Sequence, residues 1–210
     1  MEKDFWQKRW EENEIGFHES EFNPQLLRNF EKLSLEKGSR VFVPLCGKTL
    51  DITWLLQSGY RVAGAEWSRL AVEQLFEGLK LEPKIKKTSD FEIFSAQDLD
   101  IYVGDIFALT QEALGPAHAV YDRAALVALP EEARKRYAAH LTKISAGARQ
   151  LLLSFDYDQS GLEGPPFSVS GKEIKELYSG AYQVSLLESK DVPGGLKGVV
   201  AAKAEVWLLR

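Results

Sequence analysis

The stretch Arg40-Val-Phe-Val-Pro-Leu-Cys-Gly-Lys48, followed by Arg61-Val-Ala-Gly-Ala-Glu66, decides the fold. The first run predicts a buried strand that ends near Pro44 in a tight loop, and the second predicts a strand that ends in an acid. The residues between them have helical periodicity and stop at Gly59. This order of strand, loop, helix and strand is typical of the nucleotide-binding half of an open α/β sheet.

The position of Glu66 indicates what such a unit would bind. Glu66 follows Gly47 by 19 residues, and an acid about 20 residues after the first glycine reaches the ribose hydroxyls of a nucleotide. A carboxylate accepts hydrogen bonds from both hydroxyls of such a pair. We therefore expect an adenosine-type cofactor, the alternative being a solvated acid at a strand end.

The rest of the chain continues the alternation of strand and helix patterns, which predicts a doubly wound, mainly parallel α/β sheet. The last two strand patterns have no clear helix between them, and we expect one antiparallel strand there. Residues 78–98 and 158–170 are weakly patterned, and we interpret both as loops within one domain, 1–210. The strand patterns after Glu66 cover residues 101–107, 119–122, 150–155, 184–187 and 204–209.

Composition narrows the class of protein. The hydrophobic fraction is 45%, the charged fraction 27% and the net charge −5, values that are ordinary for a globular protein and argue against a nucleic-acid partner. The chain has no apolar run of membrane-span length and no signal-like start. A single cysteine, Cys46, fits a reducing compartment, so we expect a cytoplasmic protein. The three histidines have no metal-binding spacing, and we expect no metal.

The loop after the first strand matches the motif of a phosphate-binding loop only in part. Gly47-Lys48-Thr49 matches the end of that motif, but Phe42 stands where it requires glycine, and Pro44 removes a backbone donor. The triple-glycine dinucleotide motif is also missing. A loop with a single glycine suits a ligand without a pyrophosphate, with Gly47 allowing close approach to the backbone.

Other candidate residues stand at predicted strand ends. Asp105 could accept from an adenine amino group or cap the next turn. Arg123, after Asp122, is suited to an anionic group, although an arginine at a surface more often forms an ordinary salt bridge. Cys46 is interpreted as a small apolar side chain rather than a nucleophile.

An aromatic leader precedes the first strand, and we interpret it as an N-terminal helical cover over the site, about residues 1–30. Trp6 and Trp10 share a helix face, and aromatic faces attract desolvated cations. The leader contains Trp6, Trp10, Phe17 and His18.

Together these residues resemble the thiopurine S-methyltransferase family, bacterial branch, over nearly the whole chain. The two most specific segments are the loop 43–48 and Tyr121-Asp-Arg-Ala-Ala-Leu-Val127. The other matching segments are 5–10, 16–18, 64–66, 104–107 and 164–167.

The resemblance implies a class I methyltransferase with a seven-stranded, Rossmann-like sheet that binds S-adenosylmethionine. It implies that Phe17, with Trp6, lies in the N-terminal cover near the donor and substrate. Arg123 is also the candidate for acting on the acceptor. The implied donor-binding residues are Trp10, Leu45, Glu66, Ile106 and Arg123.

This family performs methyl transfer to the sulfur of an aromatic or heterocyclic thiol, and we extend the expectation to reduced selenium or tellurium, hence metalloid detoxification. We expect a monomer acting on a small molecule. The stretch 194–202 departs from the family, with Lys197 as its only cation where arginines are usual. The alternatives are a nicotinamide-dependent oxidoreductase and a non-catalytic S-adenosylmethionine-binding protein.

Overall fold

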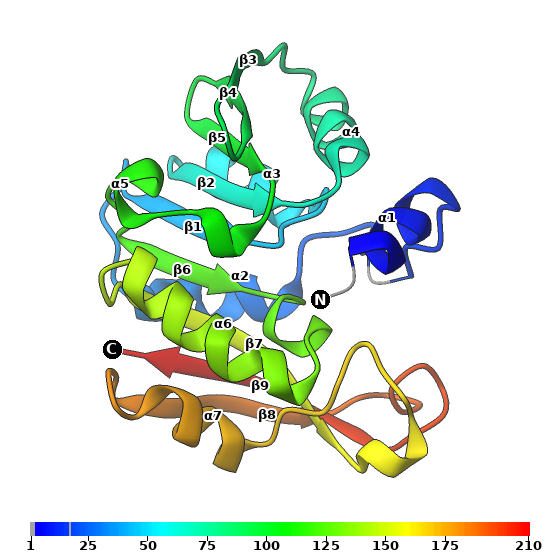
Figure 1. Cartoon of the computed structure of the whole chain (residues 1–210). Coiled ribbons are helices and arrows are strands. Elements are labelled where there is room, and N and C mark those ends of the chain that lie inside the picture. The colour runs from blue at the N-terminus through cyan, green and yellow to red at the C-terminus, as the bar shows by residue number, and fades with distance from the viewer. Residues whose placement is uncertain (1–2, 17) are drawn as a thin grey trace.

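The computed structural model describes residues 3–16 and 18–210 of the chain. Over these residues one mixed sheet lies between two layers of helices (Figure 1). The strands are β1 (Arg40–Pro44), β2 (Arg61–Glu66), β3 (Lys84–Lys87), β4 (Glu92–Ala96), β5 (Leu99–Val103), β6 (Ala119–Asp122), β7 (Arg149–Tyr157), β8 (Val184–Asp191) and β9 (Ala202–Leu209). The α-helices are α1 (Lys3–Glu11), α2 (Pro24–Asn29), α3 (Asp51–Gln57), α4 (Arg69–Leu79), α5 (Gln111–Leu114), α6 (Glu131–Ile144) and α7 (Gly171–Tyr178). The short 3₁₀ turns are η1 (Phe30–Leu33), η2 (Ile106–Ala108), η3 (Leu126–Ala128) and η4 (Gln159–Gly161).

The described strands follow the order β3-β4-β5-β2-β1-β6-β7-β9-β8. The five central strands, from β5 to β7, run parallel. Strand β9 pairs antiparallel with both β7 and β8, which confirms the antiparallel strand expected at the C-terminal end. The doubly wound arrangement is therefore the predicted one.

The predicted number of strands was wrong, because the described residues form nine rather than seven. Residues 78–98, interpreted as a loop, contain the hairpin β3–β4, which pairs antiparallel with the edge of β5. All four residues of β3 are exposed, so this edge strand has no alternation of buried and polar residues. Its sequence, Lys-Ile-Lys-Lys, is nevertheless typical of a charged edge strand.

Two hydrophobic cores cover the two faces of the sheet. One contains residues of α6 and α7, including the fully buried Tyr137 and Ile174. The other contains Leu26 of α2, Ile52 of α3 and Val72 of α4. Strand β1 is buried along its whole length because helices lie on both sides of it.

The carboxyl ends of the parallel strands meet at one edge of the sheet, where open α/β sheets bind ligands. Figure 1 shows α1 beyond the arrowheads of β2 and β6, at this edge. Helix α2 instead packs on a face of the sheet with Leu26 fully buried. Helix α1 therefore lies near the edge, whereas α2 belongs to the core. We call this edge the carboxyl edge below.

Candidate functional site

Glu66 lies at the carboxyl edge, where backbone donors from two loops hold its carboxylate. Its Oε2 accepts from the N–H of Gly47 at 2.7 Å, and its Oε1 accepts from the N–H groups of Trp67 and Ser68, both at 2.8 Å. The side chain is buried. Burial raises the pKa of this carboxyl, and the three N–H donors oppose the rise. Glu66 thus joins the loop after β1 to the start of α4.

These contacts leave limited room for a ligand on Glu66. A carboxylate has about four acceptor positions, and the backbone donors use three of them. The position left open is on Oε2. This geometry fits one ribose hydroxyl, fewer than the pair expected from the sequence.

Gly47 and Trp10 form the second part of the site. The indole of Trp10 is buried against this glycine, such that a Cβ built on Gly47 would lie 2.9 Å from Cζ2 of Trp10. Gly47 also has a φ of +51°, in the left-handed region that glycine adopts without strain. The structure therefore places Trp10 of α1 directly on the loop that Glu66 holds.

Leu45 and Ile106 come to the same edge from neighbouring loops. Leu45 has a φ of +45°, which is uncommon for a residue with a side chain and is typical of functional loops. Ile106 begins η2, is buried, and its carbonyl lies 2.7 Å from Nε2 of His140. Asp105 caps η2, since its Oδ1 accepts from the N–H of Phe107 at 2.9 Å. The capping interpretation of Asp105 is confirmed.

Asp122 and Arg123 are neighbours in sequence but have different surroundings. Asp122 is fully buried, with Oδ1 accepting from Leu126 N–H at 3.1 Å and Oδ2 from Tyr137 O–H at 2.8 Å. Arg123 instead contacts the segment between α1 and α2, where its Nη2 lies 2.7 Å from Oε1 of Glu19. Strand β6 ends at Asp122, so Asp122 lies in the sheet whereas Arg123 begins the loop that follows it, which explains the separation. Asp122 is therefore part of the core, whereas Arg123 lies at the carboxyl edge.

Asp122 gives a prediction about stability. Burial raises its pKa to about 6 from 3.8. Because the folded state then holds the proton more tightly than the unfolded chain, this group stabilises the fold most below about pH 4 and loses that contribution as pH rises through about 6. A rise of this size is worth about 2–3 kcal/mol. In urea unfolding at pH 4 and pH 7, Asp122→Asn should remove a pH-dependent loss of roughly that size. The neutral amide resembles the protonated carboxyl, since its oxygen accepts from Leu126 N–H and its NH2 donates to the hydroxyl oxygen of Tyr137.

The matched control is Asp98→Asn, at an exposed aspartate. That variant should keep the wild-type difference between the two pH values. Equal pH dependence of wild type and Asp122→Asn would contradict the assignment.

Cys46 lies beneath the loop and does not resemble a nucleophile. The residue is buried, and burial, with the charge of Glu66 as a second cause, raises the pKa of its thiol well above the usual value. A thiol in that state is a poor nucleophile. These observations support its interpretation as a small apolar side chain.

The structure shows the positions of all the predicted site residues except Phe17. It brings Trp10, Leu45, Glu66, Ile106 and Arg123 to the carboxyl edge. Phe17 lies outside the described residues. In the described part of the chain, no cluster of three or more histidine, cysteine or acidic side chains is arranged to hold a metal ion. Nor does any described helix have the length and apolar character of a membrane span.

Two features of the site were not predicted. One is Glu19, whose partner Arg123 is distant in sequence, and no local pattern around Glu19 indicates the pairing. The other is the turn of the β3–β4 hairpin, where a Cβ built on Gly104 would lie 2.6 Å from the carbonyl oxygen of Asp90. The turn of this hairpin therefore packs against the end of β5, just before Asp105.

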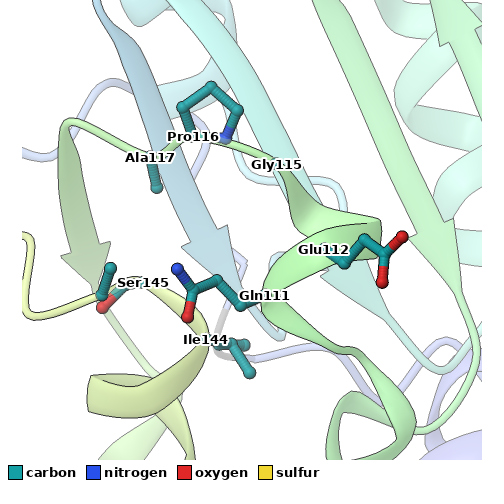
Figure 2. A pocket seen from close by; sticks show the side chains of 8 residues that line it. Gln111, Glu112, Gly115, Pro116, Ala117, Ile144 and Ser145 are labelled. Carbon is teal, nitrogen blue, oxygen red and sulfur yellow. The ribbon is translucent and has the colours of Figure 1, made fainter.

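One surface depression lies away from this edge. It has a volume of about 620 Å³ and lies between α5, the loop before β6 and the end of α6, as Figure 2 shows. Its lining residues precede β6 and β7, so it is at the amino ends of the strands. Ligands of open α/β sheets bind at the opposite ends. We therefore assign the site to the carboxyl edge.

Comparison with solved structures identifies the fold class. A structure of 1,6-didemethyltoxoflavin-N1-methyltransferase from Burkholderia thailandensis, with bound 1,6-didemethyltoxoflavin and S-adenosylhomocysteine, has a TM-score of 0.66 at 14% identity, covering 99% of this chain and 86% of that one. A TehB-like SAM-dependent methyltransferase from Corynebacterium glutamicum has a TM-score of 0.57 at 12% identity, covering 99% and 98%. The fold is that of class I methyltransferases.

Comparison of sequences identifies the family. The family model for thiopurine S-methyltransferase (TPMT) matches residues 1–210. Thiopurine S-methyltransferase of Xanthobacter autotrophicus is 54% identical over 210 residues, covering 100% of this chain and 99% of that protein. The thiopurine S-methyltransferase of Teredinibacter turnerae is 50% identical over 209 residues, covering 100% and 97%. The chain therefore belongs to the thiopurine S-methyltransferase family.

Proposed function

We propose that this protein transfers a methyl group from S-adenosylmethionine to the sulfur of an aromatic or heterocyclic thiol. The proposal rests on one observation above all, the buried Glu66 that backbone N–H groups hold at the carboxyl edge with one acceptor position open. Membership of the thiopurine S-methyltransferase family supports the same reaction.

The residues present fit an adenosine donor. Glu66 would accept from a ribose hydroxyl, Gly47 leaves room for the indole of Trp10 beside the loop, and Ile106 would flank the adenine. Trp10 and Leu45 would line the donor on the side of the loop. When bound, S-adenosylmethionine supplies a methyl group already activated on a sulfonium sulfur.

The chain therefore has mainly to align and shield the reactants. Aligning two reactants is worth about 7–11 kcal/mol of the barrier when the geometry is good. Aromatic thiols are substantially ionised at neutral pH, so no strong general base is required. Arg123 would stabilise an anionic acceptor, directly or through water, and Phe17 would contact it from the N-terminal cover. Asp122 is fully buried beneath Tyr137 and Leu126, which argues against its use as a proton acceptor.

Two extensions belong to the same proposal. Reduced selenium and tellurium species are soft nucleophiles like thiolates, so the site would also methylate them. We further propose that the protein acts as a monomer in the cytoplasm, on small molecules rather than nucleic acid, as its net charge of −5 and single cysteine support.

The test is a direct assay of the purified protein. With S-adenosylmethionine and a panel of aryl thiols and selenium compounds, we expect the methylated product and S-adenosylhomocysteine in equal amounts by mass spectrometry. Tight binding of S-adenosylhomocysteine without turnover on any member of the panel would favour a non-catalytic binding protein. Binding of NADH in its place would favour an oxidoreductase.

A further inference from the structure

Glu19 covers the arginine of the carboxyl edge. It lies between α1 and α2, and its Oε1 is 2.7 Å from Nη2 of Arg123. The arginine side chain is only 13% exposed, whereas that of Glu19 is 46% exposed. The carboxylate therefore lies on the outer side of Arg123, where an incoming anion would have to approach.

Glu19 is fixed in this position by a connection to the core. Its Oε2 accepts from Nδ2 of Asn23 at 3.2 Å, and the backbone N–H of Asn23 donates to Oδ1 of the buried Asp51 at 2.8 Å. The other oxygen of Asp51 accepts from the O–H of Tyr121 at 2.9 Å, on the strand that precedes Arg123. The segment that presents Glu19 is thus bound to the same strand as its partner.

Two lysines, Lys48 and Lys197, also donate hydrogen bonds within the protein. Nζ of Lys48 donates to Oε1 of Gln74 at 2.8 Å, and Nζ of Lys197 donates to the carbonyl of Pro165 at 2.8 Å. Burial lowers the pKa of His18, and the charges of Lys48 and Arg123 lower it further, whereas Glu19 opposes them. Glu19 is thus the acid that offsets a locally positive group of side chains.

We propose that Glu19 determines acceptor specificity by pairing with Arg123, so that thiols carrying a second anionic group are disfavoured. This inference rests on the proposed function. A carboxylated acceptor brings a second negative charge that has to displace Glu19 from Arg123 and meets its like charge. An acceptor charged only at sulfur would use Arg123 through water and leave the pair with Glu19 in place. Specificity often depends on such a repulsive element as well as on attraction.

The experiment compares two acceptors that differ only in that charge, 4-mercaptobenzoate and its methyl ester. In Glu19→Gln the KM for the carboxylate should fall about fivefold, the usual size of a partly exposed ion pair, with kcat and the KM for the ester unchanged. The matched control is Glu21→Gln, an exposed acid two residues away. It should leave the ratio of the two KM values at the wild-type level.

Three outcomes separate the possibilities. An unchanged KM ratio in Glu19→Gln, or an equal shift for both thiols, overturns the inference while leaving the proposed function intact. Failure of the wild type to methylate either thiol overturns the proposed function and this inference together. If thermal unfolding shows that Glu19→Gln does not fold, Glu19→Ala serves for the same comparison, and the same change in ratio is required of it.

Discussion

Replacing Glu66 with alanine should weaken the binding of S-adenosylhomocysteine by about 100-fold or more. The variant loses the contact to the ribose and also leaves three N–H groups, of Gly47, Trp67 and Ser68, without their acceptor. Loss of the ribose contact costs about 1–3 kcal/mol of binding free energy, and a 100-fold change corresponds to about 2.8 kcal/mol. The unpaired N–H groups add to the loss because the loop is no longer held in the shape that binds the donor. Isothermal titration calorimetry with S-adenosylhomocysteine measures the loss directly.

Two further variants test whether the loss of affinity is specific to the carboxylate of Glu66. Glu66→Gln keeps the size of the side chain, but its amide nitrogen cannot accept, so binding should fall by an intermediate factor. Glu77→Ala changes an exposed acid of α4 and should bind as the wild type does. If Glu66→Ala binds the ligand within twofold of wild type, Glu66 is not part of the donor site.

Replacing Gly47 with alanine should lower donor affinity by at least about tenfold. The new Cβ would lie 2.9 Å from Cζ2 and 3.3 Å from Cη2 of Trp10, so the indole has to move. The left-handed backbone adds strain of about 1–3 kcal/mol. Because Gly47 also donates to Glu66, both changes act on the loop that would hold the donor.

The matched control separates strain from the loss of the site. Gly38 has a similar backbone conformation, with φ +80°, but no atom lies within 4 Å of a Cβ built there. Both Gly38→Ala and Gly47→Ala should lower Tm by about 2–4 °C for each kcal/mol of strain. Only Gly47→Ala should lose affinity in calorimetry, and equal affinity of the two variants would show that Trp10 and the loop are not coupled to binding.

The hairpin β3–β4 shows where sequence patterns stop being informative about the fold. A strand is predicted from buried residues in alternation, and β3 has none, since all of its residues are exposed. What makes Lys84–Lys87 a strand is its pairing with β4, which in turn pairs with β5. That pairing is a property of the assembled sheet.

The site also has one part that the sequence predicts and another that only the structure shows. Glu66 was predicted because a fixed spacing along the chain places an acid at the end of the second strand. Its three donors were not, because one of them comes from the loop after β1. Spacing along the chain carries no information on the acceptor positions of Glu66 that the backbone uses.

The sequence by itself determined the succession of strand, loop, helix and strand that ends at Glu66, the doubly wound sheet and the family, because these depend on local periodicity and on short, fixed spacings. The tertiary structure alone decided which side chains meet at the carboxyl edge. Glu19 and Arg123 come from opposite parts of the chain, and Asp122 turns into the core beside an arginine that does not. Such contacts arise from packing in three dimensions, where distance along the chain no longer predicts distance in space.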